Sequence, residues 1–245
     1  MIDRVKQLED DQLETFDAEY VSSDRWEIVK ACIDKDFPEG DFSFLDLGGG
    51  NGVFADKILQ HYPNANATVL DNSELLLNKN TEHPRKSTIL SSVEDMRDAL
   101  SGRKFDIIFM NWLLHHVIAD SYAHTAQYVL NTLKITPEFL TDRGRVSVFE
   151  NIYDGYIFDN LPSHLIFQLT SSRTLAGPIK KLGANTAGVG VCFRSKKNWQ
   201  ELIETSGLSI LKYSDDSEWN LSKIKRLILH IRSLRVGHFW AAAGH

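Results

Sequence analysis

The chain has 245 residues, of which 42% are hydrophobic and 10% aromatic, and its formal net charge is -6 at pH 7. This length and apolar content allow one domain, spanning residues 1–245, with a sizeable core, and the acidic balance argues against broad nucleic-acid binding. The two cysteines do not have metal-ligand spacing, so we expect no bound metal. The sequence has no run of 18 apolar residues and no charged-then-apolar leader, so we expect a cytoplasmic protein with no membrane partner.

Residues 1–40 are predicted to be a helical segment. One apolar face is formed at helical spacing by Trp26, Ile28, Val29, Cys32 and Ile33. Phe37-Pro38-Glu39-Gly40 then ends the element. The simplest interpretation is a helix that packs over the sheet edge.

The stretch from Phe42 to Phe54 reads as strand, glycine loop and helix, the helix running from about Val53 to His61. Glycines let the backbone adopt positive φ and approach a ligand closely, and the N–H groups of the following helix point into the same crevice. Gly50-x-Gly52-x-x-Ala55 satisfies a loose dinucleotide fingerprint. Asp46, just before the glycines, instead suits a cationic ligand.

A second strand, Ala67 to Leu70, ends in Asp71, 19 residues beyond Gly52. At that place one carboxylate can accept both hydroxyls of a ribose. The alternative is an ordinary capping residue for the helix from Ser73 to Lys79.

Two further strands follow, Ser87 to Leu90 and Lys104 to Met110. The first leads into Ser91–Met96 and a short helix from Asp95 to Leu100. The second runs into Asn111–Val117, whose start should face the reaction centre. His115 and His116 are a poor metal site, because neighbouring helical residues point about 100° apart and no third ligand is evident.

A helix over 121–134 precedes a fifth strand, Arg145 to Phe149, which ends in Glu150. Residues 151–194 form an insertion longer than ordinary loops, with many aromatic residues and a glycine-rich segment at 183–190. We expect it to cap the active site and form a dry pocket for a small, flat or apolar acceptor. A dimerisation element that makes the protein a homodimer is the alternative.

The C-terminal part is predicted to be a helix over 195–206, a strand over 209–213 and an antiparallel last strand over 236–242. Before that strand, basic residues alternate with apolar ones between Lys223 and Arg235. This pattern favours a solvated face of an amphipathic element over a nucleic-acid patch.

Asp46-x-Gly48-x-Gly50-x-Gly52 resembles motif I of the class I S-adenosylmethionine-dependent methyltransferases. The segment from Phe105 to His116 is similar to the strand-four region of their small-molecule members. The resemblance covers residues 42–150 closely and 195–243 loosely. It implies an α/β fold with a Rossmann-like, mostly parallel seven-stranded sheet, helices on both faces and a helical cap.

The resemblance also implies site residues. The cofactor S-adenosyl-L-methionine would contact a set drawn from the ends of four strands: Asp46, Gly48, Gly50, Gly52, Asp71, Asn72, Ser92, Val93 and Asn111. Ser92 replaces an acid that many family members carry. The N-terminal segment often covers the cofactor too, through Phe16 and Tyr20 here.

For catalysis we single out His115, His116 and Glu150 as candidate bases, with packing as the alternative for the histidines. Trp112, Tyr156, His164 and Arg194 are the candidate substrate-binding residues, Arg194 for an acceptor carboxylate or merely a salt bridge. The predicted reaction is methyl transfer to a small molecule. An RNA or protein methyltransferase and an NAD-dependent oxidoreductase are the alternatives.

Overall fold

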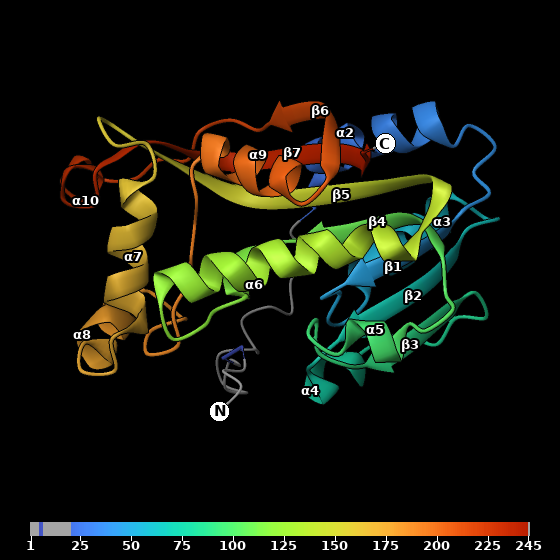
Figure 1. The fold of residues 1–245 in the computed structure, drawn as a ribbon, viewed down its shortest axis with the longest axis horizontal. Coiled ribbons are helices and arrows are strands. Elements are labelled where there is room, and N and C mark those ends of the chain that lie inside the picture. Colours follow the sequence, from blue (N-terminus) through green and yellow to red (C-terminus); the bar gives the residue numbers. More distant parts are fainter. Residues whose placement is uncertain (1–4, 7–20, 245) are drawn as a thin grey trace.

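The protein is a seven-stranded α/β domain, seen here in a computed structural model that describes residues 5, 6 and 21–244 (Figure 1). The sheet order is β3-β2-β1-β4-β5-β7-β6. β7 is antiparallel to both of its neighbours, and the other pairs are parallel. The strands are β1 Ser43–Leu47, β2 Asn66–Asp71, β3 Lys86–Leu90, β4 Phe105–Asn111, β5 Leu140–Gly155, β6 Leu208–Asp215 and β7 Ile231–Ala243. The predicted fold class is confirmed.

Helices cover both faces of this sheet, with α6 crossing in front of it in Figure 1. The α-helices are α2 Ser23–Asp36, α3 Val53–His61, α4 Glu74–Leu77, α5 Met96–Ala99, α6 Tyr122–Ile135, α7 Leu161–Ser171, α8 Ala176–Lys181, α9 Lys196–Thr205 and α10 Lys223–Ile228. Two short 3-10 helices, η2 Leu114–His116 and η3 Thr136–Phe139, flank α6.

Alternating side chains of the central strands build two separate cores. Phe44 and Phe109 point to the face covered by α2 and α3, where they meet edge to face with ring centroids 5.6 Å apart. Leu45 and Met110 point to the opposite face, covered by α5, α6 and α9. Because both faces are buried, β1 and β4 are apolar at most positions, as is usual for parallel strands between helices.

β5 is much longer than the predicted strand over 145–149. It begins at Leu140, so Asp142-Arg143-Gly144, which precede the predicted strand, lie inside β5, where the pairing with β4 shifts register. It also continues past Glu150 to Gly155, because Asn151–Asp154 pair with Ser233–Val236 of β7. The paired strand therefore takes up the first five residues of the predicted insertion.

The rest of the insertion forms a small helical unit beyond the end of β5. Ile166 and Phe167 of α7 are buried against Val191 and Cys192 of the returning segment, whereas α8 buries no side chain. Figure 1 shows α7 and α8 together at one end of the molecule.

Candidate functional site

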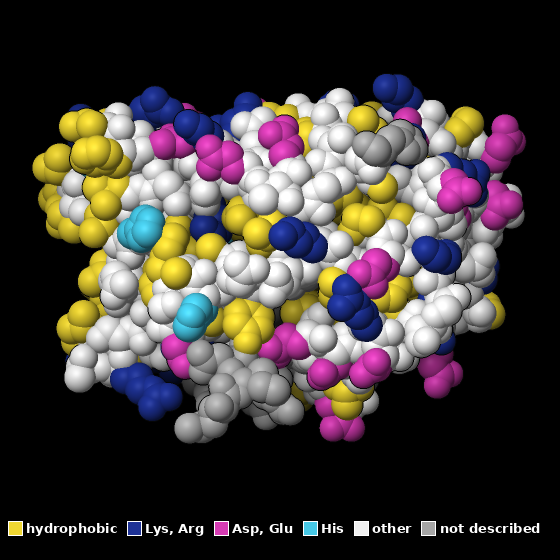
Figure 2. All heavy atoms as spheres, viewed as in Figure 1, with side chains coloured by type: hydrophobic (Ala, Val, Ile, Leu, Met, Phe, Trp, Pro, Cys, Tyr) yellow, Lys and Arg dark blue, Asp and Glu magenta, His cyan; other side chains and the backbone are white. Residues whose placement is uncertain are grey.

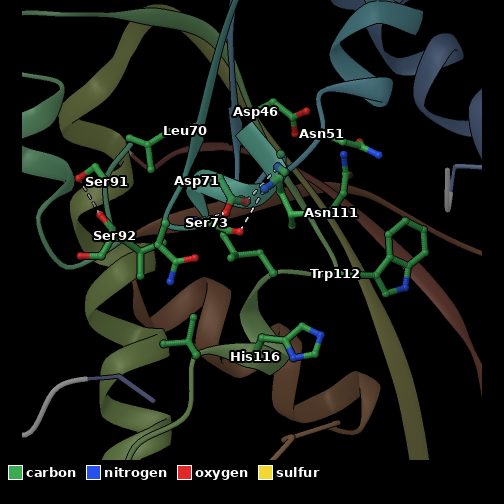
Figure 3. Close-up of a pocket in the computed structure, with 18 of the residues that line it drawn as sticks. Asp46, Asn51, Leu70, Asp71, Ser73, Ser91, Ser92, Asn111, Trp112 and His116 are labelled. Carbon is green, nitrogen blue, oxygen red and sulfur yellow. Dashed lines mark hydrogen bonds between the residues drawn. The ribbon is translucent and has the colours of Figure 1, made fainter. Parts of the chain in front are cut away.

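A cavity of about 640 Å³ opens at the carboxyl ends of β1, β2, β3 and β4. Four loops line it, one after each of these strands, as expected for ligand sites in α/β sheets. In Figure 3, Ser91 and Ser92 lie toward one side, Asn111 and Trp112 toward the other, and Asp71 between them. The predicted residues that line the cavity are Asp46, Gly48, Gly50, Asp71, Asn72, Ser92, Val93, Asn111, Trp112 and His116.

The glycine loop after β1 is shaped by close contacts. A Cβ on Gly49 would lie 2.6 Å from the Asp46 carboxylate and 2.9 Å from Val69, so only glycine lets the loop pass over Asp46. Gly52, at φ +73°, does not line the cavity. A Cβ there would lie 1.8 Å from the Asn80 amide oxygen, while the Asn80 amide nitrogen donates to the Gly50 carbonyl at 2.8 Å. Gly52 and Asn80 thus fix the loop from behind.

Asp71 ties this loop to the end of β2. One carboxylate oxygen accepts the Gly50 N–H at 2.9 Å and the other accepts the Ser73 N–H at 2.8 Å. Burial raises the pKa of this carboxyl, against the effect of the two backbone donors. Each oxygen keeps a further lone pair, so Asp71 can still accept a ligand hydroxyl. The helix-capping alternative is not observed, because the Ser73 side chain caps α4.

Asp46 and Asn111 carry buried polar atoms that the described part of the chain does not satisfy. One carboxylate oxygen of Asp46 and both amide atoms of Asn111 have no hydrogen-bond partner among residues 5, 6 and 21–244. Burial, with a smaller contribution from the charge of Asp71, raises the pKa of Asp46 to about 7. Buried groups of this kind normally have partners, so both side chains have hydrogen-bonding capacity left for a polar ligand.

Ser92, which was predicted to contact the cofactor, takes part in a local hydrogen-bond pattern. The Ser92 hydroxyl donates to the Asp95 carboxylate at 2.9 Å and accepts the Asp95 N–H at 3.2 Å. This turn uses the donor hydrogen and one lone pair of the Ser92 hydroxyl at the start of α5, and one lone pair remains. Ser92, like Val93 and the exposed Asn72, lines the cavity, but its hydroxyl is already partly engaged.

Trp112 is held in a strained backbone conformation at the end of β4, with φ +52°. Its indole stacks on Phe149 with ring centroids 5.4 Å apart and donates to the Asn151 side-chain oxygen at 3.2 Å. Left-handed backbone costs a non-glycine residue of order 1–3 kcal/mol, and it persists where the surroundings enforce it. Trp112 thereby forms one wall of the cavity.

The three candidate bases lie in different places. His116, on η2, lines the cavity, and burial lowers its pKa well below the usual value, so its imidazole is neutral near pH 7. His115 and Glu150 are buried and do not line the cavity. The Glu150 carboxyl contacts the His115 ring nitrogen at 2.6 Å and accepts the Leu114 N–H at 2.8 Å and the His115 N–H at 3.3 Å.

Glu150 therefore holds η2, the turn that carries His116. Burial raises the pKa of Glu150, to about 8, and lowers the pKa of His115, so the neutral form of each is favoured. We interpret Glu150 as a positioning residue rather than a base that meets substrate. The sequence placed Glu150 at the end of a strand, but it lies inside β5 with its side chain directed at η2.

The three predicted substrate residues of the insertion do not line this cavity. Tyr156 is half-exposed and packs edge-on against His230, and the exposed His164 stacks on Tyr122 with ring centroids 3.6 Å apart. Arg194 is buried, donates to the Asn198 side-chain oxygen at 2.8 Å and lies over the Tyr122 ring. The predicted carboxylate site at Arg194 and the capping role of the insertion are thus separated from the cavity lining.

Sequence reasoning missed several lining residues. Leu113 and Val117 continue the segment after β4, Leu76 lies on α4, and Val5, Lys6 and Val21 come from the N-terminal segment. The first two carried a signal, since they flank a predicted site residue in the loop after a buried strand. The N-terminal residues carried no such signal, except that the N-terminal segment often covers the cofactor in the family that the sequence resembles. The predicted contributors Phe16 and Tyr20 lie outside the described residues.

The described part of the chain offers neither a metal-ion cluster nor a membrane-spanning helix. In its described part, no three His, Cys, Asp or Glu side chains are grouped to hold a metal ion. None of the helices described is long and apolar enough to cross a membrane.

Comparison with known proteins agrees with this geometry. A family described as "Methyltransferase domain" matches residues 44–135, from β1 to the end of α6. The protein is 35% identical over 71 residues to malonyl-[acyl-carrier protein] O-methyltransferase 2 of Ilyobacter polytropus, covering 29% of this chain and 27% of that protein. It is 24% identical over 183 residues to a protein named ferrochelatase from Campylobacter jejuni subsp. doylei, covering 66% of this chain and 57% of that one.

A solved structure has a similar fold. CalO1, a methyltransferase in calicheamicin biosynthesis solved with S-adenosylhomocysteine bound, matches 96% of this chain and 59% of its own at 14% identity and a TM-score of 0.51. This chain thus spans only part of each relative, and the CalO1 match speaks for the fold alone. The matched domain, the strand order and the glycine loop beneath the cavity agree, and residues 44–135 form a class I S-adenosylmethionine-dependent methyltransferase domain.

Proposed function

We propose that this protein transfers the methyl group of S-adenosylmethionine to a small-molecule acceptor by in-line displacement. The observation that carries the proposal is the pair of unsatisfied buried side chains, Asp46 and Asn111, at the glycine loop. A carboxylate on β1 and an amide on the neighbouring β4 match the ammonium and carboxylate of an amino acid, which the methionine part of this cofactor retains. A nicotinamide dinucleotide has no such group for Asp46.

The residues present fit the cofactor. Asp46 would face its ammonium, a positive charge that would return the pKa of Asp46 toward its ordinary range. Asn111 would pair with its carboxylate, and Asp71 would accept from its ribose hydroxyls. When bound, S-adenosylmethionine supplies an activated methyl group, so the chain need only align an acceptor and exclude water.

The acceptor side of the cavity is apolar. Trp112, Leu113 and Val117 line it next to His116, which favours a flat or apolar acceptor. The neutral His116 ring would take a proton from an acceptor hydroxyl, with Glu150 fixing the turn that carries it. An amine or carbon acceptor would place less demand on this histidine.

Calorimetry with S-adenosylhomocysteine and with NAD tests the cofactor, because only one should bind at micromolar concentration. A screen with a labelled methyl donor then tests the acceptor class. Binding of NAD alone would favour the oxidoreductase alternative. Salt-sensitive RNA binding with methylation of the RNA would favour the other one.

A further inference from the structure

Five large apolar side chains are strongly exposed at the end of the molecule where β5 and β7 meet. We call this group the apolar corner: Ile157 81%, Phe158 67%, Ile224 72%, Leu227 77% and Ile228 68% exposed. Figure 2 shows hydrophobic side chains gathered there, at the upper left, over the place of α10 in Figure 1. Clustered exposure of this kind marks a surface that contacts something else.

The loop that carries half of the apolar corner is held in place by His230. The ring Nε2 of His230 accepts the Ile157 N–H at 2.9 Å, and its carbonyl accepts the Tyr156 N–H at 3.2 Å. Gly155 closes the turn, because a Cβ there would lie 2.1 Å from the Phe158 carbonyl oxygen. The backbone polar groups thus face inward while Ile157 and Phe158 are held outward.

The other half, α10, is fixed in the same manner. The Ser222 hydroxyl caps the helix by accepting the Lys225 N–H at 3.3 Å. The Arg226 guanidinium donates to the Arg232 carbonyl at 2.9 Å and the Trp219 carbonyl at 3.2 Å. These bonds fix one side of α10 to the fold, and the apolar side chains occupy the other.

The charge around the apolar corner is positive although the chain as a whole is acidic. Lys223, Lys225 and Arg232 are exposed, and the described residues offer them no ion-pair partner. Among the nearby acids, Asp215 pairs with Arg235 and Glu218 with Arg226, whereas Asp159, next to Phe158, has no ion pair among the described residues, so three cations face one unpaired acid. A second copy related by a two-fold axis would bring the same cations face to face, which disfavours a homodimer through this surface.

The apolar corner lies at the same end of the sheet as the cavity. Phe149 of β5 is opposite Asn111 at the end of β4, and β5 then runs on to Gly155. At about 3.3 Å per residue, the loop lies roughly 20 Å beyond the level of the cavity. A flat surface touching this end would therefore face the cavity side of the protein.

We propose that the apolar corner docks this protein onto an anionic lipid surface. Ile157, Phe158 and the apolar side of α10 enter the headgroup boundary, and Lys223, Lys225 and Arg232 contact lipid phosphates. The corner is convex in Figure 2, a shape that enters a lipid surface without needing a complementary partner. This revises the expectation of no membrane partner, and it does not depend on which acceptor is methylated.

Sedimentation of the full chain with phospholipid vesicles, without cofactor or acceptor, tests the proposal. We expect at least about tenfold stronger binding to phosphatidylcholine vesicles with about 30 mol% phosphatidylglycerol than to phosphatidylcholine alone, falling about tenfold in roughly 0.5 M salt. No binding, or equal binding to both vesicles, would overturn the proposal.

Paired variants separate the two contributions. Ile224→Ser with Leu227→Ser should weaken binding to the anionic vesicles about tenfold, and Lys223→Glu with Lys225→Glu should remove the preference for them. The control, Lys35→Glu with Arg103→Glu, makes the same charge change at exposed sites away from the corner and should bind like wild type. Equal thermal stability of all variants shows that they are folded.

Two other outcomes would overturn the proposal. One is a dimer that Leu227→Ser dissociates in a protein that does not bind vesicles, which assigns the corner to a second copy. The other is RNA binding that the lysine variants abolish and the apolar variants leave intact, again without vesicle binding.

Discussion

Replacing Asp71 by Asn separates the two tasks that the structure gives this side chain. The carboxylate accepts the Gly50 N–H at 2.9 Å and the Ser73 N–H at 2.8 Å, and it lines the cofactor cavity. Asn has nearly the same size but only one accepting oxygen. Its NH₂ group must therefore face either the Gly50 or the Ser73 N–H, donor against donor.

The expected losses differ in size. Loss of a charged acceptor for the ribose hydroxyls should weaken cofactor binding by about 1.5–3 kcal/mol, which is roughly 10- to 150-fold in Kd. The loss in folding stability should be smaller, about 1 kcal/mol. Burial of the charged carboxylate costs free energy, as the raised pKa of Asp71 shows, and the neutral Asn avoids this cost. The gain offsets part of the lost backbone hydrogen bond.

Calorimetric titration with S-adenosylhomocysteine measures the first loss and urea unfolding of the cofactor-free protein the second. Asp106→Asn is the matched control. Asp106 accepts the Ser43 N–H at 2.9 Å and the Thr141 hydroxyl at 2.9 Å at the amino end of β4, away from the cavity. It should lose stability and keep wild-type affinity. Equal affinity of Asp71→Asn and wild type would refute the ribose role and leave Asp71 as a loop anchor only.

Three further predictions follow from the same contacts. Gly52→Ala should cost about 2–4 kcal/mol of folding free energy in urea unfolding, and Gly102→Ala only about 1–2 kcal/mol. Both glycines have φ +73°, but only a Cβ on Gly52 would clash, with Asn80 at 1.8 Å. Equal losses would contradict this contact. The raised pKa of Glu150, about 8 against an ordinary 4.5, contributes stability that is fully present below pH 4.5 and lost as pH rises toward and through 8. The unfolding free energy should therefore fall by about 1–2 kcal/mol more between pH 6.5 and 8 in wild type than in Glu150→Gln, and parallel curves would show that the carboxyl is ionised throughout. In hydrogen exchange, the amides of α7 should be protected without ligand because Ile166 and Phe167 are buried. The helix α8 buries no side chain, and its amides should gain protection with cofactor and acceptor if the insertion closes. Full protection of both helices without ligand would leave the insertion as fixed scaffold.

The order of elements could be predicted from the sequence because its signals are local. An apolar run that ends in glycines predicts a buried strand and a ligand loop, and α3 spans Val53–His61 as the pattern indicated. Asp71 follows β2 directly, and parallel strands end at one edge of the sheet, so its place beside the glycine loop followed from chain order alone.

The tertiary structure alone decided the extent of β5 and the role of Glu150. β5 continues to Gly155 because it pairs with β7, whose residues lie some 80 positions later and leave no mark near Glu150 in the sequence. That pairing puts Glu150 inside the sheet, where its carboxyl meets His115 and η2 instead of the cavity. It also carries Tyr156 beyond the cavity edge, to the corner that His230 fixes. The sequence shows that the insertion is rich in aromatic residues. Which surface these residues face depends on long-range strand pairing that local patterns do not encode.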